Sequence, residues 1–170
     1  MIKFFKYLFA ISMLVACISD AQSLKPNQAV ATITASATVE GNVDVIVMKD
    51  LEFEITSLSP TELIVDPQKN PFSGEIKIVG NPNSLVRVTN ERESILRHEN
   101  GQLQLYFRYI LSGNTSEVQR ESVLLTQNNE VRLSDRGAYY LWVGGQLSGL
   151  ENIIPGNYGM ELTIEVEYIL

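Results

Sequence analysis

The stretch that decides the fold is PGNYGMELTIEVEYIL, residues 155 to 170. From residue 160 onward every second residue is apolar, and glutamates and a threonine fill most of the positions between them. A two-residue period of this kind is typical of a β-strand with one buried face and one solvent-exposed face. On the buried face of this strand we expect Met160, Leu162, Ile164, Val166 and Tyr168.

The same alternation recurs along the chain, whereas helical periodicity is nearly absent. Turn-forming residues such as those of Gly80-Asn81-Pro82-Asn83 separate the alternating segments. We expect strands at 29–39, as two short pieces within 43–58, and around 62–66, 76–78, 86–88, 103–109, 123–125, 131–133, 138–147 and 160–168. This pattern predicts an all-β sandwich of about 8–10 short antiparallel strands.

Two adjacent glycines, Gly144 and Gly145, stand in the middle of one predicted strand. A glycine inside a strand usually marks a β-bulge or a close approach by another part of the backbone. We therefore expect one of these two features in the segment AYYLWVGGQLSGL.

The N-terminus, MIKFFKYLFAISMLVACISDAQS, has the composition of a secretory signal peptide. Lys3 and Lys6 precede an apolar segment, residues 7–18, that is too short to cross a bilayer. Small residues at the −3 and −1 positions of Ser19-Asp20-Ala21 predict cleavage before Gln22. The expected localisation is therefore outside the cytoplasm, in the periplasm, at the outer-membrane surface or in the extracellular space.

A second interpretation of the same region stays open. Leu14-Val15-Ala16-Cys17 resembles the lipobox of bacterial lipoproteins, in which the cysteine is lipidated. The simpler interpretation is that Cys17 is one more apolar residue of the signal peptide. With cleavage after residue 21, residues 22–170 would form a single β-sandwich domain without cysteine, which must be stable without a disulfide.

The charge balance limits the classes of partner. The chain contains 13 Lys+Arg and 20 Asp+Glu, for a formal net charge of −7, and it has no cluster of basic residues. Nucleic acids and anionic lipid surfaces both favour such clusters. We expect neither a nucleic-acid partner nor membrane insertion after signal cleavage.

Residues for catalysis or metal binding are sparse. His98 is the only histidine and stands in LRHENGQ, which we interpret as a polar, exposed turn. A Ser-His-Asp triad would depend on it, and no Gly-x-Ser-x-Gly motif supplies a nucleophile. One histidine without a cysteine in the mature chain cannot make a typical zinc site. The sequence therefore predicts a protein that is not an enzyme and has no cofactor or metal.

Carboxylates and aromatic residues offer the remaining candidates. A hydrolase could use paired carboxylates, here Glu91 with Glu93 or the group Glu161, Glu165 and Glu167. The latter three alternate with the apolar residues, so we interpret them as a solvated strand face. Sugars could stack on aromatic residues, but at alternating strand positions packing is the more common role for Tyr139, Tyr140, Trp142 and Tyr158.

Three stretches together resemble the DUF4402 family of exported bacterial proteins. They are AVATITASATV (29–39), GNPNSLVRVT (80–89) and LWVGGQLSGLENIIPGNYGMELTIEVEYIL (141–170). One departure is Leu51-Glu52-Phe53-Glu54, where the family usually has Asp-Leu-x-Phe-Gly, so Glu54 replaces a glycine. The resemblance assigns no biochemical activity.

The layout is also similar to that of pilin and spore-coat subunits, which implies an immunoglobulin-like or pilin-like sandwich. In those subunits a strand from a chaperone or from the next subunit completes the fold. Their last strand carries a glycine and, twelve residues later, a tyrosine, as Gly156 and Tyr168 do here. The resemblance implies an assembly strand of Gly156, Tyr158, Met160, Leu162, Ile164, Val166 and Tyr168, with Ala29–Val39 as either a donor strand or the domain's own first strand.

The leading hypothesis is a non-enzymatic, exported structural or surface-assembly protein resembling fimbrial subunits. Its expected partners are other copies of the chain or a periplasmic chaperone, bound through strand addition. The alternative hypothesis is a surface binding module anchored through a lipid on Cys17, with a glycan as one candidate ligand.

Overall fold

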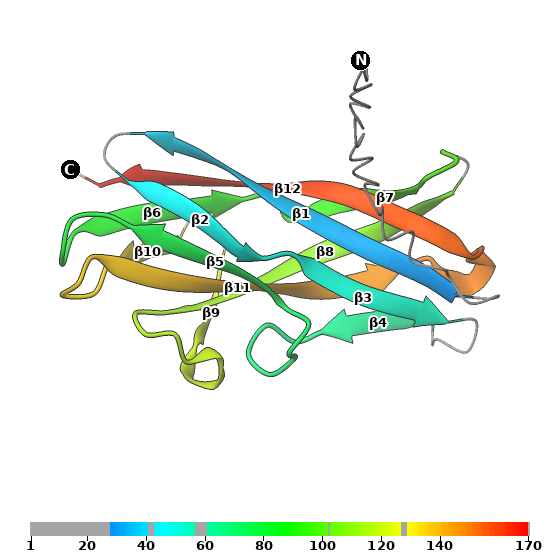
Figure 1. Cartoon of the computed structure of the whole chain (residues 1–170), viewed down its shortest axis with the longest axis horizontal. Coiled ribbons are helices and arrows are strands. Elements are labelled where there is room, and N and C mark those ends of the chain that lie inside the picture. The colour runs from blue at the N-terminus through cyan, green and yellow to red at the C-terminus, as the bar shows by residue number, and fades with distance from the viewer. Residues whose placement is uncertain (1–27, 41–42, 57–60, 102, 127–128, 170) are drawn as a thin grey trace, which may run out of the picture.

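The computed structural model describes residues 28–169, except residues 41–42, 57–60, 102 and 127–128 (Figure 1). The predicted signal peptide and Cys17 lie outside the described residues. The described strands are β1 (Gln28–Glu40), β2 (Asp44–Lys49), β3 (Leu51–Thr56), β4 (Glu62–Val65), β5 (Gly74–Val79), β6 (Leu85–Asn90), β7 (Glu93–His98), β8 (Gln104–Asn114), β9 (Val123–Leu125), β10 (Asn129–Arg132), β11 (Ala138–Ser148) and β12 (Gly156–Tyr168). Two single-turn 3₁₀ helices, η1 (Gln119–Glu121) and η2 (Leu150–Asn152), accompany them. In the described part of the chain, no helix has the length and apolar character needed to span a membrane.

The strands form two groups that enclose the core. One group is ordered β3-β1-β12-β6-β10, and the other is ordered β2-β5-β11-β8-β7, with β4 added to β11 and β9 added to β8. Strand β7 also pairs briefly with β12 and so connects the two groups. The result is a barrel-like β-sandwich, and the predicted all-β fold is confirmed.

Two segments of the chain pass from one group of strands to the other. Strands β2 and β3 are separated only by Asp50, yet β2 pairs with β5 and β3 pairs with β1. Likewise only residues 91–92 separate β6, which pairs with β10, from β7, which pairs with β8. Such bends let one strand serve both sheets of a sandwich.

The core lies between the two groups and is apolar. Its largest fully buried side chains come from strands of both groups: Ile33, Leu51, Ile76, Ile78, Leu96, Phe107, Leu141, Leu147, Tyr158 and Leu162. Burial of apolar area is the main favourable contribution to folding, so these side chains hold the two groups together.

The structure contains more strands than the 8–10 predicted from the sequence. One reason is β7, because its sequence ESILRH was included in no predicted strand, although Leu96 and His98 are both buried. Another difference is that β1 and β12 pair in parallel, whereas the other strand pairs are antiparallel. Figure 1 shows the two strands side by side with their arrowheads at the same end.

The paired glycines of β11 mark a close backbone approach, one of the two predicted features. A Cβ atom added at Gly144 would lie 2.2 Å from the carbonyl oxygen of Val65, and one at Gly145 would lie 2.4 Å from that of Arg108. Strand β11 keeps an unbroken register with β8 through both glycines, so the structure has no bulge there.

Candidate functional site

The predicted alternation of β12 is present in the structure. The side chains of Tyr158, Leu162, Ile164 and Val166 are almost completely buried, and those of Met160 and Tyr168 are half-buried. On the opposite face Glu161 and Glu165 are exposed, and Glu167 forms an ion pair with Arg87 at 2.8 Å. The buried side chains of β12 are therefore part of the core of the sandwich.

Both edges of β12 are occupied by other strands. Along one edge β1 pairs with it over twelve residues, from Ala29 opposite Gly156 to Glu40 opposite Glu167. Along the other edge β12 pairs with β7 at residues 158–159 and with β6 at residues 164–168. Within the described residues, then, a partner strand could reach the first edge of β12 only by taking the place of β1.

The first end of β12 is packed against a buried histidine. The exposed position predicted for His98 is wrong: its side chain is 5% exposed, because it lies on the same face of β7 as Leu96. Its Nδ1 accepts a hydrogen bond from the backbone N–H of Asn100 at 3.1 Å. Nε2 therefore carries the proton and donates to the carbonyl oxygen of Pro155 at 3.2 Å. The ring also meets Tyr158 edge-on, with centroids 4.8 Å apart.

Gly156 allows this packing. Its φ is +144°, a value that side-chain-bearing residues rarely adopt, and an added Cβ would lie 2.1 Å from Nε2 of His98. The imidazole of His98 therefore occupies the space that a side chain at residue 156 would need.

The last part of β12 is fixed by Tyr168. The tyrosine hydroxyl oxygen accepts a hydrogen bond from the backbone N–H of Asn81 at 2.8 Å. A Cβ added at Gly80 would lie 2.6 Å from the same oxygen, so the ring end rests directly on the turn between β5 and β6. Gly156 and Tyr168, the pair that the resemblance singled out, thus fix opposite ends of β12 to other parts of the fold.

Strand β1 differs from β12 in the size of its buried side chains. Its described inward-facing residues are Ala29, Ala31 and Ile33, with the half-buried Ala35 following. It pairs with β12 along one edge and with β3 along the other, but with neither strand through a hairpin. Backbone pairing therefore contributes more to holding β1 in place than side-chain burial does.

Three of the four aromatic residues considered for sugar stacking are buried. Tyr139, Trp142 and Tyr158 are 7%, 4% and 1% exposed, respectively, which agrees with packing as their role. Tyr140 is half-buried; its ring stacks on that of Trp142 at 6.4 Å, and Nζ of Lys77 lies 5.4 Å from its centroid. Only Tyr140 of this set presents a partly accessible ring.

Burial also changes the acidity of tyrosines in the core. It raises the pKa of Tyr139 and of Tyr158, and for Tyr158 a hydrogen bond to Ile154 partly opposes the rise. The pKa of Tyr109 is raised even more strongly by burial, and its hydroxyl contacts the sulfur of Met160 at 3.8 Å. These phenols stay protonated in the physiological pH range, so they act as packing and hydrogen-bonding groups.

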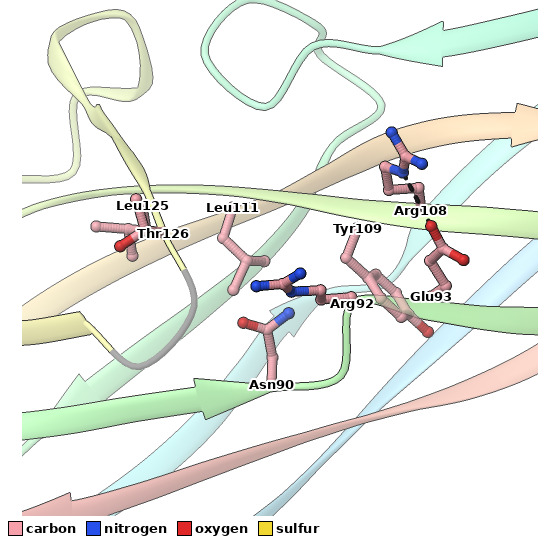
Figure 2. A pocket seen from close by; sticks show the side chains of 8 residues that line it. All are labelled: Asn90, Arg92, Glu93, Arg108, Tyr109, Leu111, Leu125 and Thr126. Carbon is pink, nitrogen blue, oxygen red and sulfur yellow. Dashed lines mark hydrogen bonds and ion pairs between the residues drawn. The ribbon is translucent and has the colours of Figure 1, made fainter.

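A cavity of about 420 Å³ opens where β6 bends into β7 (Figure 2). Its wall contains Asn90, Arg92, Glu93, Arg108, Tyr109, Leu111, Leu125 and Thr126. Nε of Arg108 pairs with the carboxylate of Glu93 at 3.0 Å, and both side chains are mostly exposed. The ion pair leaves the Glu93 carboxylate in no special environment of the kind that a catalytic acid needs. Among the described residues, no group of three or more His, Cys, Asp or Glu side chains could hold a metal ion.

A scan against protein-family models and a search of curated proteins each found no match to this chain. The resemblance to the DUF4402 family therefore stays a prediction from the residues quoted above.

Proposed function

We propose that this protein is a non-enzymatic, exported structural subunit that assembles by strand exchange. In this proposal β1 of one copy takes the position between β3 and β12 of the next copy. The position of β1 carries the proposal: it is a strand paired along both edges with strands that are not its immediate neighbours in sequence.

The chemistry of β1 suits such an exchange. An identical strand from a second copy makes the same backbone hydrogen bonds and the same side-chain contacts, so the exchange costs little beyond the entropy of association. Its small buried residues, such as Ala29 and Ala31, need no deep pockets to open before the strand leaves. Only three residues, 41–43, connect β1 to β2, and short connections of this kind favour swapping between copies.

The same arrangement explains how β12 takes part. Its two ends are fixed by Gly156 against His98 and by Tyr168 against the turn at Asn81. In the proposal β12 stays in place as the fixed wall of the binding site, and β1 is the strand that moves. A chaperone strand could occupy the same position before assembly.

The proposal is tested by supplying β1 as a separate peptide. A variant of the full chain that lacks residues 28–40 is refolded with a synthetic peptide of the sequence QAVATITASATVE. We expect the peptide to bind and to restore a cooperative thermal transition, because it supplies the missing hydrogen bonds to both β12 and β3.

The control peptide carries Ile33→Asp, which would place a carboxylate at a position that is 1% exposed. It should neither bind nor restore the transition. Equal effects of the two peptides, or no binding of the first, would contradict the proposal.

A further inference from the structure

Strand β2 is an exposed edge of the sandwich with an apolar surface. It pairs with β5 along one edge, and no described strand pairs with its other edge. Ile46, Val47 and Met48 are 45%, 39% and 52% exposed. Unpaired edge strands with apolar side chains readily accept another strand, and most proteins protect them.

A β-bulge in β2 places its two charged ends on one face. Asp44, Ile46 and Lys49 stand opposite Val79, Lys77 and Glu75 of β5, and the register shifts between Val47 and Lys49. Because alternate residues of β5 point to the same face, their three partners on β2 do so as well. Without the extra residue, Lys49 would point to the opposite face from Asp44.

This spacing makes β2 complementary to itself. When two copies of β2 run antiparallel about a two-fold axis through Ile46, each Asp44 stands opposite Lys49 of the other copy. Val45 then stands opposite Val47, and the two Ile46 side chains meet at the axis. Opposite charges and apolar pairs directly across from each other stabilise an antiparallel strand pair. A two-fold axis produces both ion pairs at once.

We propose that two copies of this chain associate through their β2 edges into one continuous sheet ordered β11-β5-β2-β2-β5-β11. The free backbone N–H and C=O groups of both edges become paired, and the exposed Ile46 and Val47 side chains lose contact with water. The surface concerned does not overlap the β1 position, so this contact is independent of strand exchange.

Lys49 already has neighbours within its own chain. Its ammonium donates to the carbonyl oxygen of Pro71, lies 6.0 Å from the centroid of the Phe72 ring and favours the ionised form of Glu75. An ammonium has three donors and this side chain is exposed, so Asp44 of the second copy reaches it without removing those contacts. Substituting Lys49 alone would nevertheless disturb Glu75, which makes D44K the cleaner single variant.

The test is a charge exchange read by sedimentation velocity over a concentration series of the full chain. Wild type should dimerise, and D44K should raise the dimer Kd at least about tenfold, because two attractive pairs become two repulsive ones. The double variant D44K/K49D should return the Kd to within about threefold of wild type, since each opposing pair again carries opposite charges.

Glu151→Lys is the matched control, because it makes the same charge change at an exposed residue outside β2. It should leave the Kd unchanged, and circular dichroism should show the same fold for every variant. A monomeric wild type at all concentrations, a dimer insensitive to D44K, or a double variant no tighter than D44K would overturn the proposal. In each of those cases the bulge and the charges of β2 would only protect the edge.

Discussion

Replacing Gly156 with alanine is expected to lower the free energy of unfolding by about 3 kcal/mol. Two effects combine at this position. The backbone has φ of +144°, which strains any residue with a side chain, and the new methyl group would lie 2.1 Å from Nε2 of His98. The imidazole would have to move, and its hydrogen bond to Pro155 would be lost. Chemical denaturation with urea measures the change.

Gly159 provides the control on the same strand. A Cβ added there meets only the carbonyl oxygen of Thr32 at 3.9 Å, an ordinary contact, and no positive φ occurs at this residue. Gly159→Ala should therefore leave stability unchanged or raise it slightly, because alanine has less conformational freedom than glycine in the unfolded chain. Equal losses at residues 156 and 159 would show that the contact with His98 does not fix the start of β12.

Truncating Ile164 to alanine should lower the free energy of unfolding by about 2–5 kcal/mol. Its side chain is completely buried in the core of the sandwich, so the substitution removes apolar contacts and leaves a cavity. Glu165→Ala changes the next residue, whose side chain is exposed, and should alter stability by less than about 0.5 kcal/mol. If both substitutions had the same small effect, β12 would not be a core strand.

The alternating pattern was enough to predict the all-β fold and the buried face of β12. A two-residue period is local, and it specifies which side chains share a face without reference to the rest of the chain. The prediction of a close approach at Gly144 and Gly145 succeeded for a similar reason, because a strand tolerates glycine poorly unless another group needs the space.

The sequence could not reveal which strands lie side by side. The pattern of β1 predicts a strand, but its parallel pairing with β12 joins residues 127 positions apart, such as Ala29 and Gly156. Nothing in a single sequence encodes such a partner. The position of His98 was missed because its neighbours Arg97 and Glu99 are charged, which resembles a polar turn. The signal that could have found it was the alternation of Leu96 with His98.

The spacing of Gly156 and Tyr168 had a clear physical meaning that the resemblance alone did not provide. These residues fix opposite ends of β12 against His98 and the turn at Gly80. The exchange of β1 between copies, by contrast, follows from the arrangement of three strands and not from any motif.

The measurement that tests this account most directly is a disulfide map of the full chain carrying C17A, T34C and E161C. Thr34 and Glu161 are exposed and stand opposite each other on β1 and β12. Neighbouring strands lie about 4.8 Å apart, within the range that a disulfide bridges. After oxidation, monomers and assemblies are separated, and mass spectrometry assigns each bond as intramolecular or intermolecular. We predict intramolecular bonds in monomers and intermolecular bonds between residues 34 and 161 in assemblies. Assemblies that contain only intramolecular bonds, or the absence of any assembly before oxidation, would contradict strand exchange.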